Sequence, residues 1–170
     1  VAALCAIAQR FGLYTHVDAA WAGSAMICPE FRSLWAGVEM ADSVVFNPHK
    51  WLGTQFDLSA HFIRSPADLT RTLAIQPEYL KTHGADGVIN YSEWSVPLGR
   101  RFRALKLWFL LRAYGLEGLR QMIRNHVAWA QSLAQRLQAV PDIELVTQPI
   151  LSLFTFRFCP AGANPEAATL

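Results

Sequence analysis

The sequence predicts an α/β fold, in which helices pack against a sheet. Segments with the apolar spacing of helices alternate along the chain with short apolar runs of the kind found in strands. A hydrophobic content of 52% and a charged content of only 16% indicate that much of the chain is buried. This composition excludes an intrinsically disordered protein.

The first elements expected along the chain are one helix and two strands. Residues 1–11 place alanine, leucine and isoleucine on one helical face, and Gly12 stands where that helix should end. Strands are predicted at 14–17, directly before Asp18, and at 43–46. Each of these strands is therefore followed by polar residues.

A third strand, a helix and a long loop are expected next. The strand is predicted at 58–63. Ser65 and Pro66 suit the N-cap and first turn of a helix that continues to about Ala74. Residues 76–97 combine proline, glycine, asparagine and aspartate without a steady period. Because so long a loop in a compact protein is usually functional or mobile, it is the best candidate for an active-site lid.

The last third of the chain predicts a connection to a second unit. Two helices, at 100–114 and 116–139, are separated by Gly115, and the second leads away from the sheet. Alternating apolar residues at 143–146 and 151–158 then predict strands. These strands would begin a smaller α+β unit.

Charge and cysteine content exclude several classes of function. The net charge of +2 is small, and no block of basic residues suggests nucleic acid or a membrane surface as a partner. No apolar run approaches the roughly 18 residues of a membrane span. Cys5, Cys28 and Cys159 are odd in number and form no CxxC pair, so neither a disulfide framework nor a zinc site is expected. We therefore expect reduced thiols and a cytoplasmic protein without a metal.

Polar residues that could take part in binding or catalysis follow the first two predicted strands. Asp18 comes after the first strand, and the run from Asn47 to Lys50 comes after the second. Ligands of open α/β sheets bind at the carboxyl ends of the strands, so the two groups could face one pocket.

The residue types at these two positions suit pyridoxal chemistry. Lys50 could tether an aldehyde as an imine if burial among Pro48, His49 and Trp51 kept its amine neutral. Asp18 could hold a protonated pyridine nitrogen, which makes the ring an electron sink. Taken alone, however, a lysine after a strand is more often a surface residue, and an aspartate there is more often a turn or cap.

Four motifs stand out along the chain: HVDAAWAGSAMICPEFR at 16–32, FNPHKW at 46–51, PEYLK at 77–81 and PLGRRFR at 97–103. With these motifs the chain resembles the group II pyridoxal-dependent decarboxylases, and within that group it is most similar to the aromatic L-amino-acid decarboxylases. They stand in the order of the family, and the resemblance extends to about Phe158.

The resemblance implies a type I pyridoxal-enzyme fold, with a mainly parallel sheet in its large domain and active sites at a homodimer interface. The chain would be an internal fragment of such a protein. Its parts would be the later portion of the large domain at 1–115, including a mobile catalytic loop at 76–97, a connecting helix at 116–140 and the start of the small α+β C-terminal domain at 141–170. Ring-stacking and phosphate-binding residues would precede Val1, so we expect this chain alone to bind the cofactor poorly.

The resemblance also implies roles for single residues. Lys50 matches the lysine that holds pyridoxal 5′-phosphate as a Schiff base, and Asp18 matches the partner of the pyridine nitrogen. Ala20 matches a residue packed against the ring. Asn47 and His49 match residues near the phosphate and the imine, although His49 could instead be a core histidine.

Two further residues are implied by the resemblance alone. Tyr79 matches the loop tyrosine that crosses to the neighbouring subunit's site and protonates the substrate carbon after CO2 leaves. Relatives with phenylalanine there tend towards aldehyde products, so Tyr79 favours an amine, although it could instead be an exposed loop aromatic. Gly99 matches a position near the partner's substrate pocket, but it could equally be a glycine needed to turn into the next helix.

The expected activity is therefore decarboxylation of an L-amino acid, aromatic by resemblance, to its amine and CO2. Two alternatives stay open within the pyridoxal enzymes: an aromatic aldehyde synthase, and a decarboxylase of acidic or diamino acids. A third alternative is a catalytically inactive paralogue that serves as a dimerising module.

Overall fold

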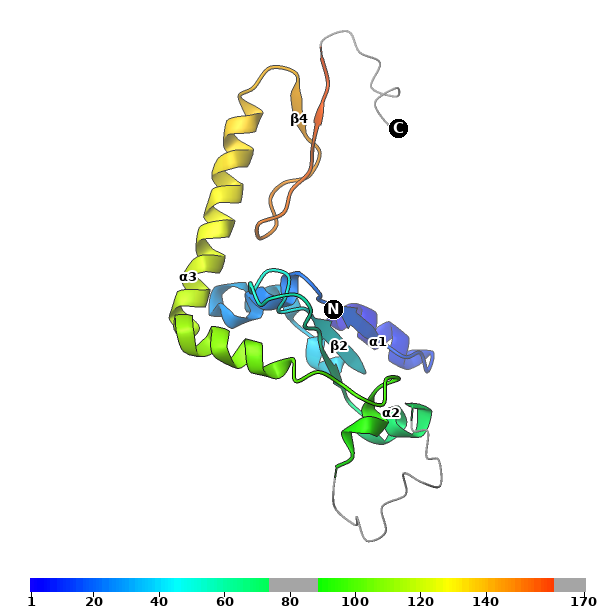
Figure 1. Ribbon diagram of the computed structural model, residues 1–170. Coiled ribbons are helices and arrows are strands. Elements are labelled where there is room, and N and C mark those ends of the chain that lie inside the picture. Colours follow the sequence, from blue (N-terminus) through cyan, green and yellow to red (C-terminus); the bar gives the residue numbers. More distant parts are fainter. Residues whose placement is uncertain (74–88, 161–170) are drawn as a thin grey trace, which may run out of the picture.

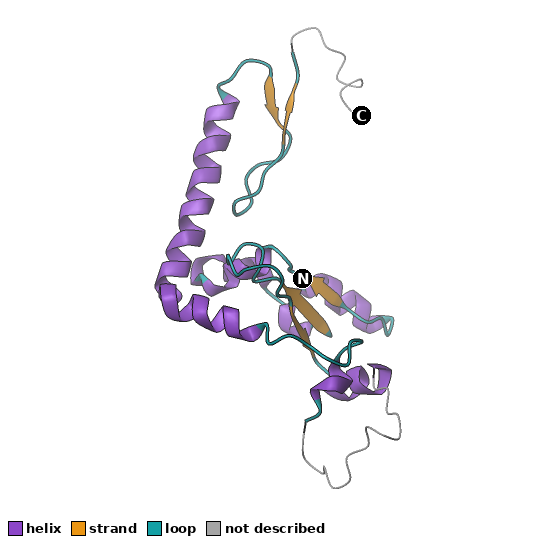
Figure 2. Cartoon of the chain, viewed as in Figure 1, coloured by secondary structure: helices purple, strands orange, loops and turns teal. Residues whose placement is uncertain are grey.

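A computed structural model describes residues 1–73 and 89–160 of the chain (Figure 1). The described helices and strands are α1 (Ala2–Arg10), β1 (His16–Asp18), η1 (Ala22–Ile27), η2 (Pro29–Trp35), η3 (Val38–Met40), β2 (Ser43–Phe46), β3 (Ala60–Ile63), α2 (Pro66–Leu73), η5 (Tyr91–Trp94), α3 (Ala104–Gln138), β4 (Ile143–Leu145) and β5 (Phe156–Phe158). The η elements are 3-10 helices. Figure 2 shows this mixture of helix and strand, which confirms the predicted α/β class.

The first sheet has three strands in the order β1-β2-β3. β1 and β2 are parallel, and Asp18 lies opposite Val45 at their carboxyl ends. β3 is antiparallel to β2. The two strands that were expected to end in polar residues are thus neighbours that end at the same edge, as the sequence predicted.

The predicted strand at 43–46 is confirmed, whereas β1 begins two residues later than expected, at His16. Thr15 is the reason for the later start. Its backbone N–H and its hydroxyl both donate to Asp42 Oδ2, each at 2.8 Å. Because Thr15 is bonded to a side chain at this point, regular pairing starts one residue further on.

The connection between β1 and β2 consists of three 3-10 helices that the sequence analysis did not predict. A parallel connection needs a crossover, and short helices provide it here. Gly23 in η1 passes so close to β2 that a Cβ atom would lie 2.6 Å from Phe46 Cβ. A side chain there would push the crossover off the sheet.

α3 contains the interruption that Gly115 predicted. The helix runs from Ala104 to Gln138, but Gly115 has φ 66° and ψ 168°, a backbone conformation found almost only at glycine. Figure 1 shows the resulting bend between the two halves of α3. The predicted pair of helices is therefore confirmed as two segments of one bent helix, although the first begins at Ala104 rather than at 100.

The core lies between the second half of α3, the crossover and the turn after β2. Its buried members are Ala25, Cys28, Trp35, Trp51, Leu52, Leu119, Ile123, Val127 and Leu151. In α3 the buried positions Leu119, Ile123 and Val127 follow the three-to-four residue spacing of one helical face. The second half of α3 thus supports the turn that carries the predicted site.

β4 and β5 form a separate antiparallel pair whose first strand lies beside α3. The strand predicted at 151–158 is wrong in its first part, because regular pairing begins only at Phe156. Leu151 has a positive φ of 55° and is buried in the core, so the chain turns there. None of the helices in the described ranges is both long and apolar enough for a membrane span.

Two glycines in α3 give a matched test of the bend. Gly115→Ala should lower the free energy of unfolding by about 1–3 kcal/mol, because alanine does not tolerate that backbone conformation. Gly118→Ala should be neutral or raise stability by up to about 1 kcal/mol, since its Cβ would meet Tyr114 Cβ at an ordinary 3.6 Å. Chemical denaturation of the full-length protein measures both, and equal effects of the two variants would contradict the account.

Asp42 makes stability depend on pH. Hydrogen bonds from Thr15 hold the pKa of this carboxyl below its ordinary value of 3.8. A lowered pKa stabilises the folded state above pH 3.8, and that contribution is lost as the pH falls towards the folded-state value. Asp42→Asn should therefore be destabilising at neutral pH, and its difference from wild type should shrink below pH 3.8. Denaturation curves at several pH values measure this, and a difference that stays constant with pH would argue against it.

Candidate active site

Asp18 is the last residue of β1, and its carboxylate is held by its own turn. Asp18 Oδ1 accepts a hydrogen bond from the backbone N–H of Ala20 at 2.9 Å. One carboxylate oxygen of Asp18 therefore stabilises the turn, which is the role that an aspartate after a strand often has. Asp18 Oδ2 has no hydrogen-bond partner within the described ranges, and the side chain is exposed. One carboxylate oxygen thus fixes the side chain, and the other is available to a ligand.

Backbone hydrogen bonds join the two loops that follow β1 and β2. Ala19 N–H donates to the carbonyl of Val45 at 2.9 Å, and Asn47 N–H donates to the carbonyl of Ala20 at 2.8 Å. These bonds extend the strand pairing by one step beyond the sheet. The structure therefore brings Asp18, Ala20 and Asn47 to one edge, as predicted.

Lys50 lies in the turn after β2, where its backbone N–H donates to the carbonyl of Asn47 at 2.9 Å. Burial among its neighbours was the condition under which this amine would stay neutral. Within this chain the condition is not met, because Pro48 and Trp51 are buried but Lys50 is exposed. Its amine has no hydrogen-bond or ion-pair partner among the described residues. The Lys50 amine is thus accessible to a ligand, but this chain alone does not shield it from water.

His49 is fixed through one ring nitrogen. Its Nδ1 lies 2.6 Å from the carbonyl oxygen of Leu58 and 3.0 Å from the backbone nitrogen of the same residue. A protonated Nδ1 donates to the oxygen and an unprotonated Nδ1 accepts from the N–H, so either tautomer keeps the ring at Leu58. The ring edge also meets Phe56, with centroids 4.9 Å apart. The core interpretation of His49 thus accounts for Nδ1 and leaves Nε2 for a ligand.

Residues 58 and 59 form hydrogen bonds with side chains of the turn after β2. For this reason β3 starts later than residue 58, where the sequence predicted it. Leu58 bonds to His49, and the Ser59 hydroxyl donates to Asn47 Oδ1 at 2.6 Å. Both residues are therefore occupied with side chains of the preceding turn, and pairing with β2 begins at Ala60. No pattern in the sequence indicated these supporting contacts.

Two stacked tryptophans support the site from the core side. Trp21 directly follows Ala20 and Trp51 directly follows Lys50, and their rings stack with centroids 4.4 Å apart and an interplanar angle of 8°. Trp51 Nε1–H donates to His126 Nδ1 on α3 at 3.0 Å. Sequence reasoning did not identify this stack, although the tryptophans stand directly after two predicted site residues.

The remaining predicted site residues are not tested by these contacts. Tyr79 and residues 76–88 of the predicted loop lie outside the described residues. Gly99 is exposed, and a Cβ placed on it would have no atom within 4 Å. It is also not among the glycines with positive φ, so the turn that precedes α3 does not depend on glycine here. A substrate-pocket role for Gly99 stays a prediction.

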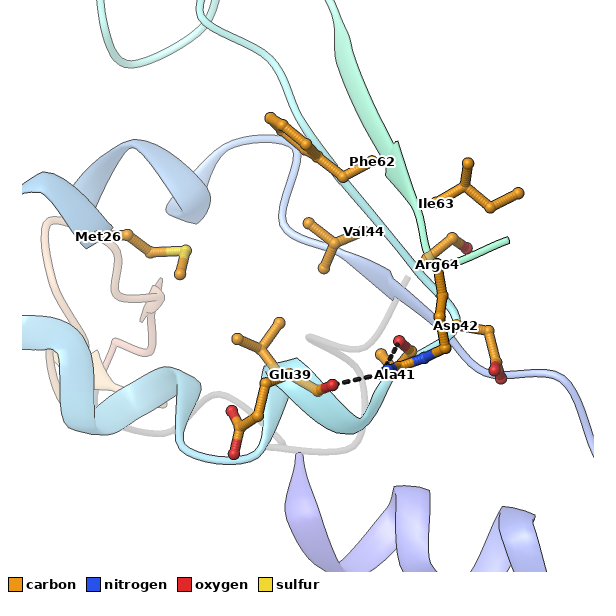
Figure 3. Close-up of a pocket in the computed structure, with 10 residues that line it drawn as sticks. Met26, Glu39, Ala41, Asp42, Val44, Phe62, Ile63 and Arg64 are labelled. Atoms are coloured by element: carbon orange, nitrogen blue, oxygen red, sulfur yellow. Dashed lines mark hydrogen bonds between the residues drawn. The ribbon is translucent and has the colours of Figure 1, made fainter. Parts of the chain in front are cut away.

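A separate cavity of about 320 Å³ lies at the opposite end of the strands. Figure 3 shows Val44 of β2 and Phe62 of β3 along it, with Arg64 donating to the carbonyls of Glu39 and Ala41. The cavity contains none of the predicted site residues. It is therefore not the candidate active site, which is the edge that carries Asp18 and Lys50.

Comparison with known proteins shows what this chain is similar to. Residues 1–159 match the family described as pyridoxal-dependent decarboxylase conserved domain. The chain is 46% identical over 166 residues to aromatic-L-amino-acid decarboxylase of Rattus norvegicus, covering 96% of this chain and 34% of that protein. It is 47% identical over 162 residues to phenylacetaldehyde synthase of Arabidopsis thaliana, covering 94% of this chain and 33% of that protein. The chain thus spans about a third of the length of these relatives.

A solved structure has the same fold. The crystal structure of Oryza sativa TDC with PLP and tryptamine matches with a TM-score of 0.92 and 41% sequence identity. The match covers 99% of this chain and 36% of the solved one. The predicted fold class, part of a type I pyridoxal-enzyme fold, is therefore confirmed.

Proposed function

Because the chain belongs to the pyridoxal-dependent decarboxylase family, we propose that the full-length protein decarboxylates an aromatic L-amino acid to its amine and CO2, with pyridoxal 5′-phosphate as cofactor. One observation carries the proposal: Asp18 ends β1 and Lys50 lies in the turn after β2, and these neighbouring parallel strands end at the same edge. Each offers a group without a partner among the described residues, a carboxylate oxygen and an amine.

These groups fit the chemistry of the cofactor. Pyridoxal phosphate, when bound, supplies an electron sink for the pair released as the bond between Cα and the carboxylate breaks. Asp18 would accept a hydrogen bond from the ring nitrogen and favour its protonated form. Ala20, whose side chain is a single methyl, would pack against the ring. Lys50 would hold the aldehyde carbon between turnovers and yield it to the amino group of the substrate.

His49 and Asn47 would act beside Lys50. With Nδ1 engaged at Leu58, His49 can present only Nε2 towards the reacting groups. Asn47 is held by Ser59 through its side-chain oxygen, which leaves its NH2 group as a donor for the phosphate. Tyr79 would donate the proton that replaces the carboxylate at Cα.

The exposure of Lys50 in this chain supports an active site shared between subunits. A lysine that reacts through its neutral amine needs surroundings that disfavour the ammonium form. We infer that other parts of the full-length protein, including the second subunit of a homodimer, cover Lys50. The domain division at 1–115, 116–140 and 141–170 belongs to the same proposal. Free cysteines at Cys5, Cys28 and Cys159 support a cytoplasmic location.

An aromatic aldehyde synthase is the second candidate, because the chain is equally similar to a relative with that name. Both reactions would use Asp18 and Lys50 in the same way. The two reactions differ in whether Cα is protonated, which gives the amine, or reacts with molecular oxygen, which leads to the aldehyde. Tyr79 is the residue that favours protonation and so the amine.

Lys50 gives the direct test of the proposal. The full-length protein supplied with pyridoxal phosphate and a panel of aromatic amino acids should release amines, and Lys50→Ala should abolish the product. Lys106→Ala, at the other described lysine, serves as control and should keep the activity. Amine formation by Lys50→Ala would contradict the assigned role. No product from the wild type with any aromatic amino acid would favour a non-aromatic substrate or an inactive paralogue.

Tyr79 gives a test of the reaction outcome. Tyr79→Phe should slow amine release by about 100-fold, because a positioned general acid contributes that much or more. The fraction of aldehyde among the products should rise at the same time. Tyr91→Phe, which removes a hydroxyl from an exposed tyrosine nearby in sequence, is the matched control. Unchanged amine release by Tyr79→Phe would remove this residue from the mechanism.

A further inference from the structure

Asp57 forms ion pairs with two arginines at the start of α3. Its Oδ1 accepts a hydrogen bond from an NH2 group of Arg101 at 2.8 Å. Its Oδ2 accepts from Nε and NH2 of Arg103, at 3.2 and 3.0 Å. The Asp57 and Arg103 side chains are only 31% and 28% exposed, whereas Arg101 is 75% exposed. Arg103 is therefore the better shielded partner and Arg101 the more solvated one.

Asp57 directly precedes the two residues that hold the turn after β2. Leu58 fixes the ring of His49 through Nδ1, and Ser59 fixes the side chain of Asn47. We call residues 57–59 the support segment. A shift of this segment would move the partners of His49 and Asn47 together, because Leu58 and Ser59 are consecutive residues.

The two arginines lie close in sequence to Gly99, the residue with a predicted substrate-pocket role. Arg101 and Arg103 follow Gly99 closely, and Arg103 is the N-cap residue of α3. The ion pairs therefore join the support segment, more than forty positions earlier in sequence, to the segment that contains Gly99. Asp57 is the carboxylate through which both arginines make this link.

We propose that Asp57 is a positioning residue for the cofactor site, and this inference rests on the proposed function. Its ion pairs with Arg101 and Arg103 hold the support segment, and thereby keep Asn47 and His49 oriented at the edge of Asp18 and Lys50. Asp57 itself touches neither substrate nor cofactor in this scheme.

Charge and geometry both give Asp57 this role. An arginine that offers Nε and NH2 to one carboxylate is directional, and lysine cannot reproduce the arrangement. The hydrogen bonds from Arg103 hold the pKa of Asp57 below its ordinary value, so the carboxyl is ionised at neutral pH. Loss of this charge would leave two nearby guanidinium groups without their shared counter-charge.

The chain offers a matched control on α2. Asp68 accepts from an NH2 group of Arg71 at 2.8 Å, but both side chains are well exposed, at 58% and 80%. This ion pair has the same chemistry, yet none of its contacts within the described part of the chain reaches Asp18, Asn47, His49 or Lys50. Asp68→Asn therefore measures the cost of losing an exposed carboxylate–arginine pair in the first turn of a helix.

The experiment uses the full-length protein with Asp57→Asn, Arg103→Lys and Asp68→Asn. Titration with pyridoxal phosphate, followed by absorbance, gives the dissociation constant of the cofactor. Hydrogen exchange of a peptide covering the support segment is measured without cofactor. We expect about tenfold weaker cofactor binding for Asp57→Asn and Arg103→Lys. Residues that orient the side chains in direct contact with a bound group have effects of that size. Faster exchange of the support segment should accompany it, and Asp68→Asn should match the wild type in both measurements.

The outcomes separate this inference from the proposed function. Wild-type protein that binds no pyridoxal phosphate would overturn the proposed function and with it the positioning role, whatever the exchange rates. Wild-type protein that binds the cofactor, with Asp57→Asn equal to Asp68→Asn in affinity and exchange, would overturn the inference alone. If Asp57→Asn does not fold, Arg103→Lys decides, since normal cofactor affinity in that variant would contradict the role.

Discussion

The parallel pairing of β1 with β2 is the constraint on which the rest of the site depends. It brings the ends of two segments that are far apart in sequence to one edge, with Asp18 opposite Val45. Bonds from Ala19 to Val45 and from Asn47 to Ala20 continue the pairing into the loops. Backbone hydrogen bonds, rather than side-chain contacts, therefore fix the positions of Asp18 and of the turn that carries Lys50. A single-residue shift of register would exchange the faces of the strands and separate these groups.

Around that edge, the side chains divide into those that support and those that react. Trp21 and Trp51 stack in the core beneath the two loops, and His126 ties the stack to α3. Lys50, next to Trp51 in sequence, and Asp18, three residues before Trp21, stay exposed. In this arrangement the packed tryptophans hold the backbone of the loops in place, while the functional atoms of Lys50 and Asp18 remain accessible.

Patterns that depend on local backbone chemistry were predictable from the sequence. The strand at 43–46 and the break at Gly115 follow from apolar alternation and from the conformational freedom of glycine. The positions of Asp18 and Lys50 at one edge followed from the rule that polar residues after parallel strands meet there. Features set by contacts across the fold were not predictable. Thr15 pairs with Asp42, for example, and so delays β1.

The errors at the site have the same origin. Burial of Lys50 among its sequence neighbours was considered as a condition for a neutral amine, but burial depends on what covers a residue in space. Trp51 packs inward, whereas Lys50 does not. The support given by Asp57 and Ser59 depends on contacts with Arg103 and Asn47, which no local pattern encodes. The resemblance to a known family supplied residue roles, but it did not supply the contacts that hold these residues.

The measurement that tests the account most directly is chemical trapping of the cofactor. The full-length protein is loaded with pyridoxal phosphate, reduced with borohydride, digested and analysed by mass spectrometry. The account predicts one phosphopyridoxyl group per chain, attached to Nζ of Lys50. Attachment to another lysine, or no attachment after saturation with the cofactor, would contradict the claim that the shared edge of β1 and β2 is the active site.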